Sequence, residues 1–399
     1  MDISIRRATA DDLATVADVD GASFGTVYSE QELQDMGSLL DLDRFYVAVD
    51  GDRIVGITGD YPFEMTVPGG RLDVPGVTWV SVDPTYRRRG ILRRLMRSQL
   101  GDYRDAGVAA AVLTASEGGI YGRFGYGVAS HVRKTSLDRR RVSLLTPGDP
   151  SAVTRASAVE ARKHMPAVHA RWREQTPGAL SRNDRWWDFL TLDREWQRGG
   201  MSGMFYLLHR DGYLAYRIKS DWSDGDPRHT CWISDYVIAS SEAHADLWQV
   251  LLGMDLVGTI ESYRIPVDDP LALLVGDGRQ VRTTHVGDGL WVRPLNVAAM
   301  LSARRYALEV DVCIAVRDDL FGDGRYHLRG GADGAECVPT DASVDLELDV
   351  ASLGSVFLGG VRVESLARAG LVDVRDRDVL VRFDRALLTD RLPQYGTGF

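Results

Sequence analysis

Cysteine is scarce in this sequence, and so are long apolar runs. Cys231, Cys313 and Cys337 are scattered over 399 residues without a C-x-x-C pair, so neither a disulfide framework nor a metal site is predicted. No apolar run approaches the ~20 residues that span a bilayer, and the first residues, MDISIRRATADDL, contain no signal-peptide core. We therefore expect a cytoplasmic protein without a membrane partner, with secretion by a non-classical route left open.

Lysine is nearly absent, and acidic residues outnumber basic ones. Lys134, Lys163 and Lys219 are the only lysines, and the formal net charge is −10 with a pI of about 5.4. An acidic chain is not expected to bind nucleic acid, whereas it suits a cationic substrate. With 399 residues, 44% of them hydrophobic, the chain is long enough for two or three domains.

The most informative stretch is VSVDPTYRRRGILRRL at residues 80–95. An alternating apolar run ends at Asp83-Pro84, a basic loop closes on Gly90, and a helical apolar pattern follows from Ile91. The free N–H groups and dipole of a helix N-terminus favour an anion, glycine allows close approach, and arginine suits phosphate. The sequence therefore predicts a phosphate-binding loop.

The loop is not a Walker P-loop, and it lacks the Gly-x-Gly-x-x-Gly of a dinucleotide site. Three arginines in a row are often only a solvated face. A strand, then R-R-x-G, then an apolar helix resembles the pyrophosphate loop of the GCN5-related N-acetyltransferases, which bind acetyl-CoA. That resemblance implies acetyl-CoA as co-substrate.

The order of predicted elements agrees with that family over residues 1–146. A strand and two helices precede a hairpin that turns at residues 50–52, and the strand and helix of the basic loop follow. A buried strand at 107–116, a short helix in EGGIYGRFGYG and a strand at 128–137 complete the unit. This is the predicted catalytic domain.

Two further domains are predicted. Residues 147–288 repeat the hairpin, strand, helix and strand, but Ala239-Ser240-Ser241-Glu242 stands where the basic loop was, so this acetyltransferase-like domain is expected to be degenerate. Residues 289–399 are expected to contain a helix within 291–303, a strand meander and further helices, an order that resembles a sterol-carrier-like domain. The predicted fold class is α+β.

Acetyl transfer also needs a polarised thioester carbonyl and a proton donor. Backbone N–H groups between Val80 and Val82 are candidates for the first role. Tyr121 is the better-placed acid, with Tyr126 a rival that the residues alone leave open. The histidines are isolated, or, like His164 and His169, spaced so that they do not share a helical face.

Together with LTASEGGIYGRFGYG at residues 113–127, the basic-loop stretch resembles the enhanced intracellular survival (Eis) family of actinobacterial N-acetyltransferases. The resemblance extends over the whole chain and implies Tyr121 as general acid and the α-carboxylate of Phe399 as general base. The acetyl-CoA contacts that it implies are Val80, Ser81, Val82, Arg88, Arg89, Gly90, Ile91, Leu92, Arg93, Ser116 and Glu117.

The family resemblance further implies acetylation of polyamine-like acceptors such as aminoglycosides, and a homohexamer built as a trimer of dimers. The segment 24–36 is expected to line the acceptor pocket, while Gly398 offers no acidic side chain beside the terminus. Two alternatives are a protein or peptide N-acetyltransferase and a non-catalytic CoA-sensing assembly whose third domain binds a lipid.

Overall fold

The computed structural model describes residues 3–222 and 225–399, which form two compact units. One unit combines Met1–Ser130 with Asp288–Phe399, and the other is His131–Gly287. The first boundary differs from the expected one at residue 146, because the strand after Ser130 pairs within the second unit. No helix in the described ranges has the length and apolar character needed to cross a membrane.

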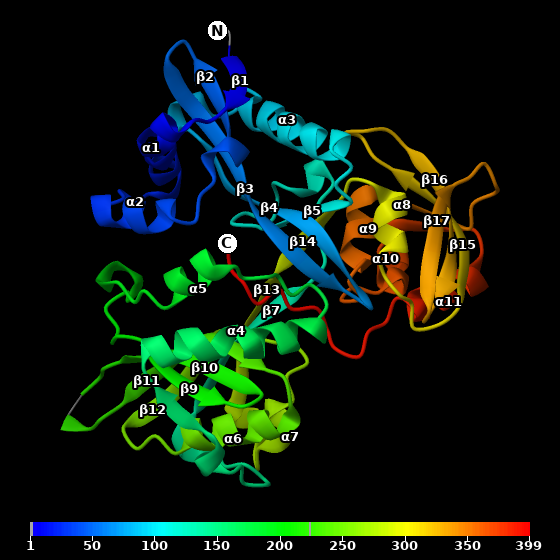
Figure 1. Ribbon diagram of the computed structural model, residues 1–399. Coiled ribbons are helices and arrows are strands. Elements are labelled where there is room, and N and C mark those ends of the chain that lie inside the picture. The colour runs from blue at the N-terminus through cyan, green and yellow to red at the C-terminus, as the bar shows by residue number, and fades with distance from the viewer. Residues whose placement is uncertain (1–2, 223–224) are drawn as a thin grey trace. The chain divides into compact units, whose positions relative to one another are not determined.

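The first sheet has seven strands in the order β1-β2-β3-β4-β5-β14-β6 (Figure 1). Its strands are β1 (Ile3–Arg7), β2 (Tyr46–Asp50), β3 (Arg53–Val67), β4 (Gly70–Val82), β5 (Ala110–Thr114), β6 (Gly127–Val128) and β14 (Leu290–Pro294). Its helices are α1 (Leu13–Phe24), α2 (Glu30–Gly37) and α3 (Ile91–Asp105). The predicted hairpin, loop strand, loop helix and buried strand correspond to β2–β3, β4, α3 and β5.

Helices α1 and α3 cover opposite faces of the first sheet. Ser81 and Val82 are neighbours on β4 and therefore face opposite sides. The Ser81 hydroxyl meets α1 through Asp20, whereas Val82 packs with Ile91 of α3. Residues Leu95, Met96 and Leu100 of α3 are buried in the same apolar stripe that the sequence pattern predicts.

One strand of the first sheet arrives from a distant part of the chain. β14 pairs antiparallel with β5 on one side and with β6 on the other. The helix expected within 291–303 is α8 (Val297–Ser302), and the strand β14 that precedes it was not predicted. An apolar strand that is buried on both faces carries no alternation that would separate it from a buried helix.

The second unit contains its own seven-stranded sheet, in the order β13-β7-β12-β11-β10-β9-β8. Its strands are β7 (His131–Asp138), β8 (Thr154–Ala156), β9 (Phe205–His209), β10 (Gly212–Lys219), β11 (His229–Ile238), β12 (Val257–Ile265) and β13 (Val281–Asp288). Its helices are α4 (Ala158–Glu174), α5 (Asp184–Leu190), α6 (Ser241–Leu252) and α7 (Leu271–Leu274). The expected strand 128–137 is divided, because β7 pairs with β12 in this sheet.

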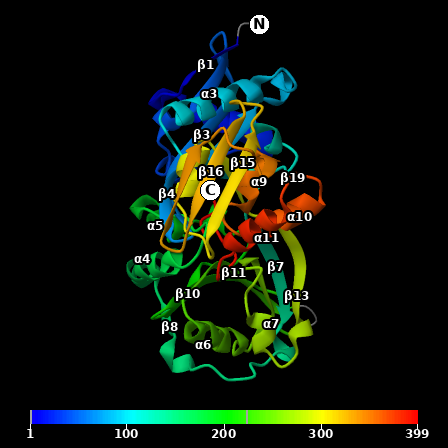
Figure 2. The same cartoon turned by 90° about the vertical axis from the view of Figure 1, so that its right-hand side faces the viewer.

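The third sheet has the order β17-β16-β15-β18-β19. Its strands are β15 (Val310–Arg317), β16 (Gly324–Gly331), β17 (Gly334–Pro339), β18 (Leu346–Asp349) and β19 (Val372–Val374). The helices beside it are α8, α9 (Val350–Val356), α10 (Val363–Arg368) and α11 (Arg377–Ala386). Figure 2 shows the last three of these helices.

Helix α9 joins the third sheet to the first. A Cβ atom added to Gly127 of β6 would lie 1.8 Å from the Ala351 carbonyl oxygen, and one added to Gly354 would lie 2.2 Å from the Val292 oxygen. The helix backbone therefore rests directly on β6 and β14. Arg293 of β14, which is fully buried, also pairs with Asp318 at 2.8 Å.

Candidate active site

The basic loop forms a backbone cradle at the start of α3. Arg88 and Gly90 both have left-handed backbone conformations, with φ of 62° and 77°, and Gly90 is the N-cap residue without a side-chain cap. Such a conformation costs a non-glycine residue about 1–2 kcal/mol, so its presence at Arg88 points to a functional constraint. The first-turn N–H groups of α3 are left for an anion.

The arginine side chains of this loop divide into two kinds. Arg89 donates to the Thr85 carbonyl oxygen at 3.0 Å and lies over the Tyr86 ring, 4.7 Å from its centroid. Arg87, Arg88 and Arg93 are exposed and make no side-chain hydrogen bond or ion pair within the described ranges. They are therefore available to phosphate groups.

Beyond this loop the sheet opens. β4 and β5 pair only at Gly76–Val112 and Val77–Leu113, so the later part of β4 has no strand partner on that edge. The pairing of β3 with β4 shifts at Ile57–Gly59, opposite Trp79, whose φ is 52°. A bulge leaves an extra residue outside the ladder, so backbone N–H groups at this point are free to meet a thioester oxygen.

The loop, the strand opening and the segment after β5 surround a hollow of about 930 Å³. It contains Tyr121 and every expected acetyl-CoA contact except Arg89, which is turned onto Tyr86. Its lining residues are Ser23, Phe24, Val80, Ser81, Val82, Tyr86, Arg87, Arg88, Gly90, Ile91, Leu92, Arg93, Ser116, Glu117, Ile120, Tyr121, Arg123 and Phe124.

Several of these lining residues were not predicted. Tyr86 and Arg87 are next to the motif and follow from the loop itself. Ser23 had no sequence signal, because its place depends on how α1 packs: its hydroxyl donates to the Val82 carbonyl oxygen at 3.2 Å. Phe24, which was expected on the acceptor side, lines this hollow instead.

Tyr121 and Tyr126 lie in different surroundings. Tyr121 is 6% exposed and borders the hollow, and burial together with Glu117 raises its pKa to about 12. Tyr126 is fully buried, its hydroxyl has no hydrogen-bond partner in the described part of the chain, and burial raises its pKa further. Tyr121 is therefore the tyrosine of this pair that a ligand in the hollow would meet.

The last residue of the sequence lies at the opening between β4 and β5. The Thr114 hydroxyl, at the end of β5, donates to a main-chain oxygen of Phe399 at 3.1 Å. The Phe399 ring packs on Phe63 at a centroid distance of 5.0 Å, and a Cβ atom added to Gly76 would lie 2.9 Å from that ring. Phe399 thus lies where β4 and β5 begin to separate.

The corresponding position in the second unit holds no such cradle. Ser240, the N-cap residue of α6, accepts a hydrogen bond from Ala243 N–H at 3.1 Å, and Glu242 lies in the first turn. A capped N-terminus with a carboxylate beside it does not favour phosphate.

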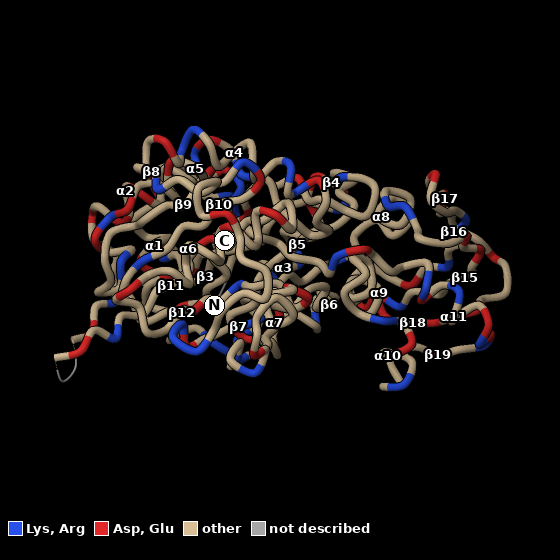
Figure 3. Tube along the Cα trace, turned by 90° about the horizontal axis from the view of Figure 1, so that it is seen from below, with Lys and Arg blue, Asp and Glu red and all other residues tan. Residues whose placement is uncertain are grey.

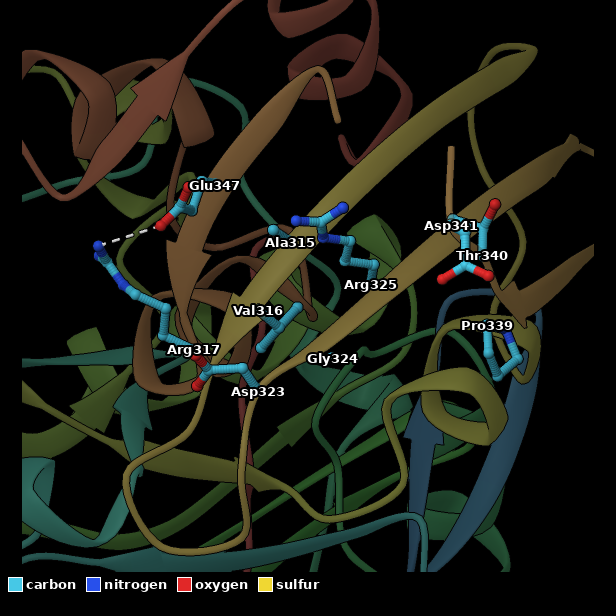
Figure 4. A pocket seen from close by; sticks show the side chains of 10 residues that line it. All are labelled: Ala315, Val316, Arg317, Asp323, Gly324, Arg325, Pro339, Thr340, Asp341 and Glu347. Atoms are coloured by element: carbon cyan, nitrogen blue, oxygen red, sulfur yellow. Dashed lines mark hydrogen bonds and ion pairs between the residues drawn. The ribbon is translucent and has the colours of Figure 1, made fainter. Parts of the chain in front are cut away.

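A further hollow, of about 510 Å³, lies on the third sheet. Figure 4 shows Arg317 pointing toward Glu347, from which it is separated by 3.4 Å. Arg325, Asp323 and Asp341 also line it, and Figure 3 shows acidic residues, in red, at β18. Charged and polar side chains therefore form much of the wall of this hollow. Within residues 3–222 and 225–399, no group of His, Cys, Asp and Glu side chains is arranged to hold a metal.

A split between parallel strands, followed by an arginine-glycine cradle at a helix N-terminus, defines an acetyltransferase of the GCN5-related class. Comparison with known families agrees. The family described as acetyltransferase (GNAT) domain matches residues 4–129, a second acetyltransferase (GNAT) domain matches 178–294, and the sterol carrier protein domain matches 297–395.

Individual relatives show to which family of this acetyltransferase class the chain belongs. The chain is 36% identical over 400 residues to N-acetyltransferase Eis of Mycobacterium tuberculosis, covering 98% of each chain. It is 39% identical over 361 residues, 88% of each chain, to an uncharacterized N-acetyltransferase of Streptomyces avermitilis. The crystal structure of Eis1 from Mycobacterium abscessus superposes with a TM-score of 0.89 at 32% identity, covering 100% of both chains. The chain belongs to the Eis family and is an acetyl-CoA-dependent N-acetyltransferase.

Proposed function

We propose that the enzyme acetylates primary amines of cationic, polyamine-like small molecules, aminoglycosides among them. The observation that carries the proposal is the hollow of about 930 Å³, which joins the arginine-glycine cradle to the Tyr121 side chain. The acidic net charge of −10 supports a cationic acceptor.

In the proposed reaction the cradle binds the pyrophosphate of acetyl-CoA, with Arg88, Arg93 and the N–H groups of α3 as donors. The thioester reaches the strand opening, where N–H groups near Val80 polarise its carbonyl. The acceptor nitrogen attacks the carbonyl carbon, and the carbon–sulfur bond breaks. Ser116 and Glu117 border the same hollow and complete the donor side.

Three proton transfers accompany this reaction. The acceptor ammonium loses one proton before it attacks, the nitrogen loses a second once it is bonded to the carbonyl carbon, and the leaving sulfur gains one. The second proton from nitrogen restores the Tyr121 phenol after it has protonated the sulfur. Tyr121 donates a proton to the sulfur that leaves, and its raised pKa of about 12 keeps the phenol protonated until then. The ammonium of the acceptor loses its proton to the α-carboxylate of Phe399 through water. An α-carboxylate ordinarily has a pKa of ~3.3–3.7, so it is ionised at neutral pH.

The donor and acceptor proposal is tested by measuring thiol release from acetyl-CoA with a panel of aminoglycosides, polyamines and lysine-containing peptides. We expect turnover with the small cationic amines, and mass spectrometry should show one acetyl group on each modified nitrogen. Turnover restricted to peptides would assign the protein or peptide acetyltransferase alternative. Acetyl-CoA binding without turnover on any amine would contradict the proposed acceptor class.

We also propose that the enzyme assembles as a homohexamer, a trimer of dimers, as the family resemblance implies. Light scattering during size-exclusion chromatography should then give six times the chain mass of 44.1 kDa. A mass of one or two chains would contradict the assembly.

A further inference from the structure

A buried carboxylate without a counter-ion lies beside the strand that holds the thioester site. Asp20 of α1 is 5% exposed, and it accepts hydrogen bonds from the Ser81 hydroxyl and the Tyr28 hydroxyl, both at 2.8 Å. No Arg, Lys or His side chain in the described ranges pairs with it. Burial raises the pKa of the Asp20 carboxyl group and so disfavours its charged form. An incoming ammonium group would favour the charged form and offset that cost.

The hydrogen bonds around Asp20 leave specific acceptor positions open. A carboxylate oxygen has two lone-pair positions, and each oxygen of Asp20 uses one of them on a hydroxyl group. The Tyr28 hydroxyl is committed as a donor to Asp20, so its oxygen can only accept further hydrogen bonds. Tyr28 is partly exposed and lies in the 24–36 segment that was expected to line the acceptor pocket.

A row of aromatic rings leads from Tyr28 to Phe399. Tyr28 and Trp79 have ring centroids 6.1 Å apart, and the Trp79 indole N–H donates to the Tyr61 hydroxyl at 3.3 Å. Tyr61 and Phe63 follow at 6.2 Å, and Phe63 and Phe399 at 5.0 Å. Tyr61 and Phe63 are buried, so Tyr28, Trp79 and Phe399, which are partly exposed, are the rings of this row that a cation can reach. An aromatic face attracts a cation by about 0.5–2 kcal/mol. The row therefore has a buried carboxylate at one end and Phe399, at the strand opening, at the other.

We propose that Asp20, acting through Tyr28, binds a second ammonium group of the acceptor while the first ammonium group lies at the strand opening. The inference rests on the proposed acceptor class and adds the residues that select for more than one charge. Asp20 is a positioning residue in this account, because Tyr28 is the group that the ligand touches. A diamine is then held at both ends, whereas a monoamine uses only the reactive end.

The test compares Asp20→Asn and Tyr28→Phe with the unchanged enzyme. The substrates are a series of α,ω-diaminoalkanes and the n-alkylamine of each chain length, assayed by thiol release. A hydrogen bond to a charged group is worth about 1.5–3 kcal/mol, so we expect kcat/KM for the preferred diamine to fall roughly 10- to 100-fold in each variant. The kcat/KM for the matching monoamine and the KM for acetyl-CoA should change less than about twofold, since neither uses this subsite.

The matched control is Asp18→Asn. Asp18 is exposed on the same helix two residues away, so this variant removes the same charge from α1 without touching the subsite. Its diamine preference should equal that of the unchanged enzyme. An equal drop in the control would assign the effect to long-range electrostatics and overturn the inference.

A purely structural role for Asp20, as a clamp between α1 and β4, gives a different result. Loss of the clamp would lower kcat/KM for monoamines and diamines alike and raise the KM for acetyl-CoA, because Ser81 borders the donor hollow. If the enzyme without substitutions acetylated monoamines as efficiently as diamines, the proposed subsite would be contradicted, while the proposed function would remain. An enzyme inactive on every amine would overturn both.

Discussion

At the scale of single residues, Tyr121 and Tyr126 carry the same hydroxyl group, but Tyr121 borders the hollow and Tyr126 is fully buried. The Tyr121 hydroxyl is bonded to no residue that the structure describes. We predict that Tyr121→Phe lowers kcat by roughly 10²–10⁴-fold, the usual contribution of a positioned general acid. Steady-state thiol release at saturating acetyl-CoA measures it.

Tyr126→Phe is the matched control, because it removes the same group five residues along the chain. The Tyr126 hydroxyl is buried without a partner among the described residues, so its removal should leave kcat unchanged and should not lower stability. If Tyr126→Phe lost activity and Tyr121→Phe kept it, the general acid would have to be reassigned.

The protonation of Tyr121 predicts the alkaline side of the pH profile. Burial and the nearby Glu117 raise its pKa to about 12, which favours the protonated phenol. The proton is therefore retained as pH rises and is lost only near that value. We predict that kcat shows no fall with an apparent pKa near ~10, the ordinary value for tyrosine. A fall at that pKa, absent from Tyr121→Phe, would show that the hydroxyl titrates as an exposed one does.

Some residues of the candidate site can be predicted from the sequence, and others cannot. The basic loop from Arg88 to Arg93 can be predicted because it lies in a contiguous motif with a chemical reason for its order. The residues alone leave Tyr121 and Tyr126 open, and only the family resemblance implies Tyr121. Asp20 and Ser23 cannot be predicted, since a single aspartate or serine on an amphipathic helix has no pattern. Their positions at Ser81 and Val82 depend on the packing of α1 on β4.

At the scale of elements, the contact of α9 with β14 depends on a missing side chain. Alanine at Gly354 would favour the helix by about 0.5–1 kcal/mol through propensity, but its Cβ would lie 2.2 Å from the Val292 oxygen. The clash should dominate, so we predict that Gly354→Ala destabilises the protein by about 1–3 kcal/mol. The shift in the midpoint of urea denaturation measures this loss of stability.

Gly101 supplies the control for this prediction. It lies inside α3, and a Cβ atom there would meet nothing within 4 Å. Gly101→Ala should therefore stabilise the protein by about 0.5–1 kcal/mol. Equal behaviour of the two variants would mean that the backbone contact of α9 with β14 does not constrain the fold.

Elements with their own periodicity are predicted well from sequence, and elements defined by distant partners are not. α3 and the β2–β3 hairpin carry amphipathic and turn signals within their own residues. β14 has the composition of a buried segment, and only its pairing with β5 and β6 shows that it is a strand of the first sheet. Likewise, nothing in residues 128–138 marks where β6 ends and β7 enters another sheet.

At the scale of the whole molecule, the compact units do not follow the order of the domains along the sequence. The first and last parts of the chain form one compact unit, and His131–Gly287 forms the other. The family resemblance supplied the three domain types, which the matching families bear out. β7 lies in the second sheet and β14 in the first because of pairing with strands that are distant in the sequence. The local sequence pattern does not encode such pairing.

The central proposal also belongs to this scale: Tyr121 and the α-carboxylate of Phe399, which are far apart in the sequence, act in one catalytic site. Phe399 lies at the opening between β4 and β5, within hydrogen-bonding distance of Thr114. The most direct measurement compares kcat for the chain ending at Phe399 with kcat for the same chain carrying one added glycine. The glycine moves the carboxylate away while leaving the Phe399 ring on Phe63, with the KM for acetyl-CoA as the control for folding. We predict a fall in kcat of roughly 10²-fold or more with that KM unchanged; an unchanged kcat would remove the Phe399 carboxylate from the mechanism.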